Sequence, residues 1–311
     1  MYFECHHGIE SEDGGYYRRR YLMATDELSF SKNLWYRLLW AYGPRKFTKA
    51  TDKFPALSGL ARLFEQKFQS KYVAGLWSTD MINGLAWQGL GDECPQAVLP
   101  DQYIAPSWSW ASYAGITAAG LSVALLPVAE IIDWDVKVKT EANPYGEIKS
   151  ALIRLRAPIT PLFQSTVETT DHEARLRRAG RTPLPRLRTR YSDDETGSLV
   201  TLDYTEHKTT GTWRKLDLYA MVLCGSRREE NSTKEPAQEN DDEESQESNE
   251  KECTQENKAL DLSHYFVLVL TRVESPDQEA GMKRLGWTMI PVAEGTKLIN
   301  DSSNWETITL F

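Results

Sequence analysis

The spacing of the apolar residues changes near Pro106, and this change limits the possible fold more than any other feature of the chain. Before Pro106 apolar residues recur every three to four positions, as in residues 30–43. After it they alternate with polar residues, as in residues 150–158. The first spacing is the period of a helix and the second that of a strand. The sequence therefore predicts an α+β fold, in which a helical aromatic-rich N-terminal part is followed by a mostly antiparallel β-sandwich or barrel.

Three helices are expected in the N-terminal part, over residues 30–43, 51–68 and 78–89. The residues expected at their ends are Gly43 for the first helix, Thr51 or Asp52 for the second, and Ser78 or Thr79 and Gly89 for the third. The apolar residues expected to face inward are Leu34, Trp35, Leu38, Leu39, Leu57, Leu60, Ala61, Phe64, Phe68, Met81, Ile82, Leu85 and Ala86.

The chain divides into residues 1–104, which carry the expected helices, and residues 105–311, which carry the expected strands. The two parts form either separate domains or one continuous domain. Residues 227–258 have no large apolar side chain and are dense in Glu, Asn, Gln and Ser. Such a segment cannot bury enough apolar surface to offset its ordering entropy. We therefore expect a disordered acidic insertion between two strands of the β-rich part.

The acidity of the chain is concentrated in that insertion. The formal net charge is −9, and residues 229–256 hold 12 acids and 2 lysines, a net of −10. The remaining 33 acids and 34 bases nearly cancel, so the total charge favours no class of partner. The N-terminus has no basic stretch followed by an apolar run, and no apolar stretch is long enough to cross a bilayer. A cytoplasmic protein without a membrane partner is expected.

No motif in the chain has the spacing of a metal, nucleotide or nucleophile site. The four cysteines lie far apart, and the paired His6 and His7 would point to opposite faces of a strand. We therefore expect no metal, no cofactor and no catalytic residue. One alternative is a hydrolase with an aromatic-lined cleft, because four carboxylates lie near aromatic residues. These carboxylates are Asp80, Asp92, Asp101 and Asp133, and nothing in the sequence pairs any two of them.

A second alternative is nucleic-acid binding through Arg175–Arg190, which has seven arginines and no acid. Against it, this segment has no interleaved aromatic residue for base stacking, and Pro183 and Pro185 prevent a continuous basic helix. The acidic insertion could also neutralise it. Nucleic acid is therefore disfavoured as a partner, and the sequence identifies no small-molecule ligand.

Two tryptophans separated by one serine, Trp108 and Trp110, raise the question of a binding platform. On a strand they would share a face, with Ser107 and Ser109 on the other. An exposed pair could stack on a sugar or a peptide, whereas a buried pair would form a dense patch of core. Core burial is favoured, because two exposed adjacent indoles would promote aggregation. The residues expected to pack against them are Leu57, Leu60, Trp77 and Trp87.

Three blocks in this order resemble the region that follows the heterokaryon incompatibility (HET) domain in many fungal proteins. They are Asp52–Ala61 ("DKFPALSGLA"), Tyr72–Trp87 ("YVAGLWSTDMINGLAW") and Ala105–Ser112 ("APSWSWAS"). The N-terminal "YFECHHGIESE" and the C-terminal strands also resemble that region. The matching motif residues are Asp52, Leu57, Ser58, Gly59, Gly75, Leu76, Trp77, Asp80, Gly84, Leu85, Trp87, Pro106, Ser107, Trp108, Ser109, Trp110 and Ser112.

The resemblance implies a part in non-self recognition and programmed cell death, and it attributes the toxic activity to the HET domain itself. The three defining blocks of that domain are missing from this chain, as in a truncated gene model or a natural remnant. The expected function is therefore an accessory or interaction region without intrinsic catalysis, whose partner is a HET domain or another protein. A surface left uncovered by the missing domain is expected around Trp35 and Trp40.

Overall fold

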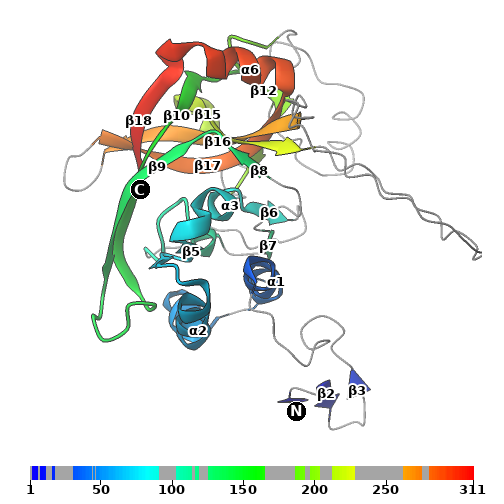
Figure 1. Cartoon of the computed structure of the whole chain (residues 1–311), viewed down its shortest axis with the longest axis vertical. Coiled ribbons are helices and arrows are strands. Elements are labelled where there is room, and N and C mark those ends of the chain that lie inside the picture. Colours follow the sequence, from blue (N-terminus) through cyan, green and yellow to red (C-terminus); the bar gives the residue numbers. More distant parts are fainter. Residues whose placement is uncertain are drawn as a thin grey trace, which may run out of the picture.

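The computed structural model describes residues 2–5, 8–11, 16–17, 31–43, 45, 47–90, 103–113, 116–118, 125–164, 186–192, 197–203, 212–227, 262–274 and 280–311. Its helices and strands give the predicted α+β fold (Figure 1). The N-terminal helices lie in the lower half of the view, and the large sheet with the C-terminal helix lies above them. The acidic insertion falls almost entirely outside the described residues, as do His6 and His7.

Helices α1 (Lys32–Tyr42), α2 (Ser58–Phe68) and α3 (Met81–Leu85) form the helical part. Ser31 is the N-cap of α1, where its hydroxyl accepts a hydrogen bond from the Leu34 amide at 3.2 Å. This bond satisfies one of the amides that a helix leaves unpaired in its first turn. Gly43 ends α1, as predicted.

The predicted starts of the second and third helices are wrong. Two 3₁₀ turns, Ala50–Lys53 and Pro55–Leu57, precede α2, so neither Thr51 nor Asp52 caps it. Another 3₁₀ turn, Ser78–Asp80, precedes α3. Pro55 begins the second of these turns, a position where the amide that proline lacks would have no partner within the turn. Leu60, expected to face inward, is 40% exposed.

One sheet dominates the β-rich part and closes on itself. Its strand order is β8-β15-β16-β17-β18-β10-β9, with β14 on β17 and an additional pairing between β15 and β10. Strands β15 to β18 and β10 therefore form a closed ring, the barrel form of the prediction. All pairings in this sheet are antiparallel except that of β17 with β18. The bounds are β8 Leu125–Pro127, β9 Glu130–Val138, β10 Ile148–Pro161, β14 Thr201–Leu202, β15 Leu218–Arg227, β16 Leu262–Glu274, β17 Ala280–Pro291 and β18 Trp305–Leu310.

Both faces of this sheet are covered, which explains why β16 is apolar along most of its length. Phe266 and Leu268 of β16 belong to the main core, which also contains the buried side chains of α1, α2 and α3. Val267, on the other face, packs in a smaller core with Leu298 of helix α6 (Val292–Asn300). The main core is thus shared between the helical part and the sheet.

A hairpin formed by β9 and β10 reaches from the sheet to α2 (Figure 1). In the turn between these strands, the Asn143 amide donates to the Ser58 hydroxyl at 3.0 Å. The Tyr145 hydroxyl donates to the Glu65 carboxylate, whose other oxygen accepts the Tyr72 amide at 3.1 Å. The Tyr145 ring also lies 5.7 Å from the Tyr72 ring. The hairpin therefore fixes α2 at both ends of its first two turns.

Short strands complete the described structure. They form a sheet of β1 to β3 near the N-terminus, a β11-β12-β13 sheet and the pairs β4-β5 and β6-β7. Their bounds are β1 Tyr2–Cys5, β2 Gly8–Ser11, β3 Tyr16–Tyr17, β4 Tyr72–Val73, β5 Leu76–Trp77, β6 Gln88–Leu90, β7 Ile116–Ala118, β11 Phe163–Gln164, β12 Arg186–Arg188 and β13 Ser198–Leu199.

Candidate functional site

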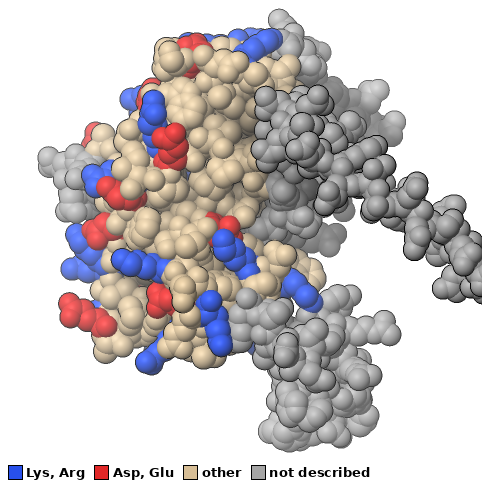
Figure 2. Space-filling view, viewed as in Figure 1, with Lys and Arg blue, Asp and Glu red and all other residues tan. Residues whose placement is uncertain are grey.

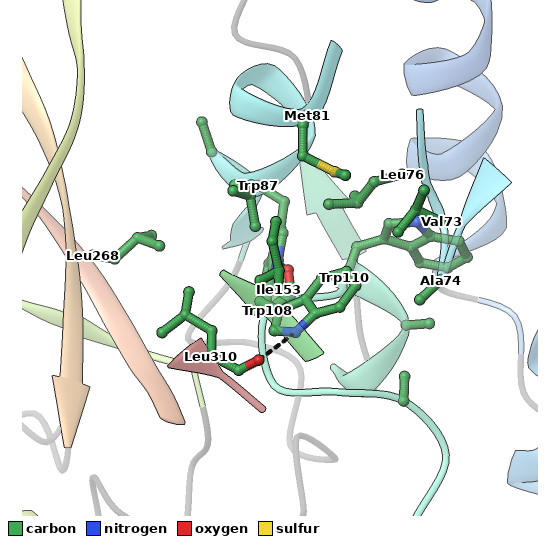
Figure 3. Packing of buried hydrophobic residues seen from close by; sticks show 14 of the residues in the cluster. Val73, Ala74, Leu76, Met81, Trp87, Trp108, Trp110, Ile153, Leu268 and Leu310 are labelled. Atoms are coloured by element: carbon green, nitrogen blue, oxygen red, sulfur yellow. Dashed lines mark hydrogen bonds between the residues drawn. The ribbon is translucent and has the colours of Figure 1, made fainter. Parts of the chain in front are cut away.

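The Ser-Trp segment lies between the helical part and the sheet (Figure 3). Trp108 and Trp110 are both 0% exposed, so the prediction of core burial is confirmed. The prediction that they lie on a strand is wrong, because the segment is irregular and ends in the 3₁₀ turn Trp110–Ser112. The Ser109 hydroxyl accepts from the Ala111 amide at 3.2 Å. Such local side-chain bonds to the backbone compete with a strand ladder.

The first half of the segment holds the C-terminal strand. The Trp108 indole donates to the Leu310 carbonyl at 3.1 Å, the bond drawn in Figure 3. The Ser107 amide donates to the main-chain oxygen of Phe311 at 3.0 Å, and the Ser107 hydroxyl donates to the same oxygen. Each of these donors is buried, so each bond satisfies a group that would otherwise be costly. The motif thus joins the middle of the chain to its far end.

The second half of the segment holds the turn before the Leu-Trp block. The Ser109 hydroxyl donates to the Ala74 carbonyl at 2.6 Å, and the Trp110 indole donates to the Gly75 carbonyl at 2.9 Å. Gly75 has φ of +96°, and a Cβ there would lie 2.6 Å from the Trp110 indole nitrogen. Only glycine tolerates both conditions. The Gly-Leu-Trp block and the Ser-Trp segment therefore fit each other directly.

A buried arginine that the sequence analysis missed completes this junction. Arg284 of β17 is 0% exposed and pairs with Asp203, with Nε 2.8 Å from the carboxylate. Its other guanidinium nitrogens donate to the carbonyls of Leu85 and Trp87 at 2.8 and 2.7 Å. Its guanidinium carbon lies 3.5 Å from the centre of the Trp87 ring. The backbone amide of Arg284 also donates to the Ser107 hydroxyl at 2.9 Å. Four chain segments thus meet at this residue.

The local fold explains how a charged side chain in a strand comes to point inward. In the pairing of β16 with β17, Val269 faces Gly286 and Leu270 faces Arg284, so Leu285 is an extra residue. Such a bulge changes the direction of neighbouring side chains. A Cβ at Gly286 would lie 2.2 Å from the Thr201 carbonyl oxygen, so glycine lets β14 approach closely enough to bring in Asp203.

A second buried cation, Lys53, lies on the other side of the Ser-Trp segment. Its side chain is 6% exposed, and its ammonium donates to the Tyr113 carbonyl and lies 5.3 Å from the centre of the Trp110 ring. Burial lowers the pKa of the Lys53 ammonium from its ordinary value of 10.5 to about 7. The Tyr42 hydroxyl donates to the Lys53 carbonyl at 2.6 Å and fixes the turn that carries it.

Asp80 is the motif carboxylate with the most contacts. It accepts from the Tyr36 hydroxyl at 2.5 Å and from the Asn83 amide at 2.9 Å, and Lys32 lies 3.5 Å away. Burial, followed by the charge of Asp80, raises the pKa of the Tyr36 hydroxyl. Asp133 lies elsewhere, in β9, where it forms a bidentate ion pair with Arg154. The described carboxylates near the aromatics therefore do not form a catalytic pair, and Asp92 and Asp101 lie outside the described residues.

The motif residues fall into two groups. Those from the second and third blocks meet around the Ser-Trp segment, and they include Leu76, Trp77, Gly84, Leu85, Trp87 and Ser112 in addition to those already placed. Those from the first block contribute less. Leu57 is buried, whereas Asp52 and Gly59 are exposed and the space around Gly59 is open, so nothing in the structure explains a glycine there. Of the expected packing partners of the tryptophans, Trp87 contacts the segment directly, since its indole donates to the Trp108 carbonyl at 2.8 Å. Leu57 and Trp77 are buried in the same core cluster, and Leu60 is exposed.

The remaining predicted features lie apart from this junction. Trp35 is fully buried, which corrects its expected exposure, whereas Trp40 is 55% exposed. Cys224 is a buried free thiol whose pKa is raised by burial to about 12, so it is unreactive at neutral pH. Within the described residues, no three His, Cys, Asp or Glu side chains are grouped to hold a metal ion.

The end of the arginine segment that the structure describes is bound to the protein itself. The Arg190 guanidinium donates to Asn304 at 2.5 Å and lies 3.5 Å from Asp301. Tyr191 donates to the same aspartate at 2.6 Å. Next to them, the buried carboxylate of Glu294 in α6 accepts from the Thr189 hydroxyl at 2.5 Å. These contacts anchor residues 189–191 against α6 and the turn that follows it.

The comparisons with family models, curated proteins and solved structures give no match to this chain. Among the described helices, none combines the length and the apolar character needed to cross a membrane.

Proposed function

We propose that this chain is the accessory, protein-interacting region of a fungal HET-type protein of non-self recognition, and that it acts in the cytoplasm without intrinsic catalysis. One observation carries the proposal. The Gly-Leu-Trp and Ser-Trp blocks are separate in sequence, yet they contact each other through two backbone-directed hydrogen bonds around Gly75. A shared set of blocks would then mark a shared fold.

The chemistry of the motif side chains supports a scaffold. The hydroxyl of Ser107 is held by a main-chain oxygen, and that of Ser109 by the Ala74 carbonyl. Both serines are buried, and neither has a histidine among the hydrogen-bond partners found here. A nucleophilic serine needs a neighbouring base and access to substrate. The same buried residues are well suited to joining three distant parts of a chain into one rigid core.

The partner in this proposal is a HET domain, covalently linked or supplied by another protein. The test is isothermal titration of the purified full chain with a HET domain taken from a protein that carries the same three blocks. We expect saturable binding to that domain and none to an unrelated domain of similar size and charge. Absence of binding, with the chain shown to be folded by its near-ultraviolet circular dichroism, contradicts the proposal.

A cellular readout tests the non-catalytic part separately. Expression of the chain alone in a filamentous fungus should leave cells viable, and co-expression with the matching HET domain should change the rate of cell death. A control strain expresses the HET domain with a Gly75→Val version of the chain, in which the Trp110 contact cannot form. Cell death caused by the chain alone would contradict the assigned role.

A further inference from the structure

A buried carboxylate of helix α6 holds the turn that follows strand β12. Glu294 lies in the first turn of α6 and is 5% exposed. One oxygen of its carboxylate accepts hydrogen bonds from the Thr189 hydroxyl at 2.5 Å and from the Ser192 hydroxyl at 2.8 Å. Within the described part of the chain, no cation pairs with this carboxylate. Two neutral hydroxyls therefore hold a buried acidic group.

The same two hydroxyls also order the turn itself. The Ser192 hydroxyl accepts from the Thr189 amide at 3.1 Å, and the Thr189 hydroxyl accepts from the Tyr191 amide at 3.1 Å. We call the contacts of Thr189 and Ser192 with Glu294 the hydroxyl latch. Opening of this latch would free the turn from α6 and expose the Thr189 and Tyr191 amides to exchange with water.

The latch is the buried part of the attachment between this turn and the C-terminal region. The other part consists of Arg190 and Tyr191, which bind Asn304 and Asp301. The side chains of Arg190 and Asp301 are 51% and 40% exposed, so water competes with their contact. A change in charge should therefore have its largest effect at Glu294.

Ser192 is the more accessible hydroxyl of the latch, and acidic residues follow it in the sequence. Thr189 is 4% exposed, whereas Ser192 is half-buried. Three consecutive acids, Asp193, Asp194 and Glu195, come directly after Ser192. Protein kinases select their substrates partly by the pattern of charge around the target hydroxyl. A serine followed by three acids fits a kinase with a basic substrate groove.

We propose that Ser192 is a phosphorylation site and that its phosphorylation opens the hydroxyl latch. In this step the bond between the γ-phosphorus of ATP and the oxygen bridging to the β-phosphate breaks, and a bond from the Ser192 Oγ to the γ-phosphorus forms. ADP leaves, and the hydroxyl proton passes to the catalytic base of the kinase. The proposal goes beyond the proposed function and does not depend on it.

The electrostatics of the latch determine the direction of the effect. Phosphorylation removes the proton that Ser192 donates to Glu294 and places a charge of about −1.5 to −2 beside an acidic group. Like charges at such short distance in a buried site repel each other strongly. The cation of this turn, Arg190, is exposed and already donates to Asn304.

The surrounding surface does not oppose this local effect. Figure 2 shows both basic and acidic side chains at the upper end of the molecule, where Figure 1 places α6. A surface of mixed charge produces no strong field of one sign. The contact with Glu294 therefore decides whether a phosphate on Ser192 is tolerated in place.

The experiment treats the purified full chain with ATP and a serine kinase that selects acidic residues after the serine. Mass spectrometry locates the phosphate, and amide hydrogen exchange of peptides covering residues 189–191 measures opening of the latch. We expect phosphate on Ser192 and at least about tenfold faster exchange in these peptides. Exchange in β16 should be unchanged, which shows that the rest of the fold remains intact.

Three variants separate the cause from other effects of the kinase. Ser192→Ala cannot be phosphorylated at this position, so kinase treatment should leave its exchange in these peptides unchanged. Glu294→Gln keeps an oxygen acceptor for both hydroxyls and removes the negative charge, so phosphorylation should accelerate its exchange much less. Ser150→Glu adds a charge at an exposed serine of β10 and should leave exchange at 189–191 unchanged.

Three outcomes overturn the proposal. Phosphate on other serines of the chain, with none on Ser192, contradicts the assigned site. Unchanged or slower exchange of phosphorylated chain contradicts opening of the latch, and slower exchange would mean that Arg190 holds the phosphate in the turn. Equal acceleration in Glu294→Gln would show that repulsion from Glu294 is not the cause. None of these measurements involves a HET domain, so their failure leaves the proposed function untouched.

Discussion

Two cations are buried on either side of the Ser-Trp segment, and the protein accommodates them differently. Arg284 has a carboxylate partner, two carbonyl acceptors and the face of Trp87. Lys53 has one carbonyl and the more distant ring of Trp110. Each cation joins separate segments of chain, yet within the described residues only the arginine contacts a carboxylate.

The difference shows which part of the junction depends on charge. A guanidinium offers five donors in a fixed plane, so it can satisfy several acceptors at once. An ammonium is a compact group that loses its proton more readily when it is buried without a carboxylate. We infer that Arg284 holds the barrel to the helical part as a charged group, whereas Lys53 serves mainly as a long side chain that fills space beside Trp110.

Removal of Arg284 should have the largest effect. Arg284→Met removes the cation that pairs with the buried Asp203 carboxylate and frees two buried carbonyls, so we expect a loss of about 3–5 kcal/mol in the free energy of unfolding. Urea denaturation followed by tryptophan fluorescence measures the change.

The matched control removes both charges. Arg284→Met with Asp203→Leu replaces the pair with apolar side chains and should recover part of the loss. If the double variant is as unstable as the single one, the carbonyl contacts and the ring contact matter more than the ion pair.

Removal of Lys53 should instead raise the free energy of unfolding, by an amount that depends on pH. The pKa of this ammonium is about 7 when folded and near its ordinary 10.5 when unfolded, so the unfolded state binds more protons between these values. The protein should therefore become more stable as the pH rises from about 7, with a contribution of up to about 1.4 kcal/mol per pH unit.

The variant Lys53→Met should lack this contribution and be at least as stable as the parent at pH 7. The quantity to compare is the difference in unfolding free energy between the two proteins from pH 7 to 9.5, in which other titrating groups cancel. A difference that stays constant with pH would mean that Lys53 keeps its proton and is paired as well as Arg284.

The contrast between the two cations could not be predicted from the sequence. Arg284 and Asp203 lie 81 residues apart, Arg284 in β17 and Asp203 directly after β14, where charged residues normally face water. Their burial depends on the bulge at Leu285 and on the close approach of β14 to Gly286, which are tertiary features. No local pattern distinguishes Arg284 from the exposed Arg154 in β10.

Local features were more predictable. The C-terminal end of α1 at Gly43, the alternation in β10 and the burial of Trp108 and Trp110 follow from the helix-ending glycine, period-two spacing and the size of the indole. The conformation of the Ser-Trp segment does not follow from period-two spacing, because the hydroxyl of Ser109 binds the backbone and competes with a strand. Trp35 and Trp40 of α1 also show that a tryptophan near the N-terminus gives no clue to its exposure without its neighbours.

Ser109 is an uncharged residue of the same junction and allows a comparison with the two cations. Ser109→Ala removes the donor to the Ala74 carbonyl and the acceptor of the Ala111 amide, which leaves buried backbone groups unpaired. We expect a loss of about 1–3 kcal/mol, less than that of Arg284→Met, measured by the same urea titration. A loss equal to that of Arg284→Met would show that the turn at Gly75, and not the ion pair, limits the stability of the junction.

The smallest loss of stability is expected for substitution of Arg154. Like Arg284, it donates two hydrogen bonds to one carboxylate, but this pair is exposed to solvent. Its guanidinium binds both oxygens of Asp133 at 2.7 Å, yet the two side chains are 53% and 44% exposed. Water already solvates both charges, so Arg154→Met should cost no more than about 1 kcal/mol, and the cost should fall in high salt. Arg284→Met should show no such salt dependence, because its charges are buried. Equal losses of unfolding free energy in the two variants would mean that burial of the charges does not determine the cost of removing the arginine. The special role assigned to Arg284 would then fail.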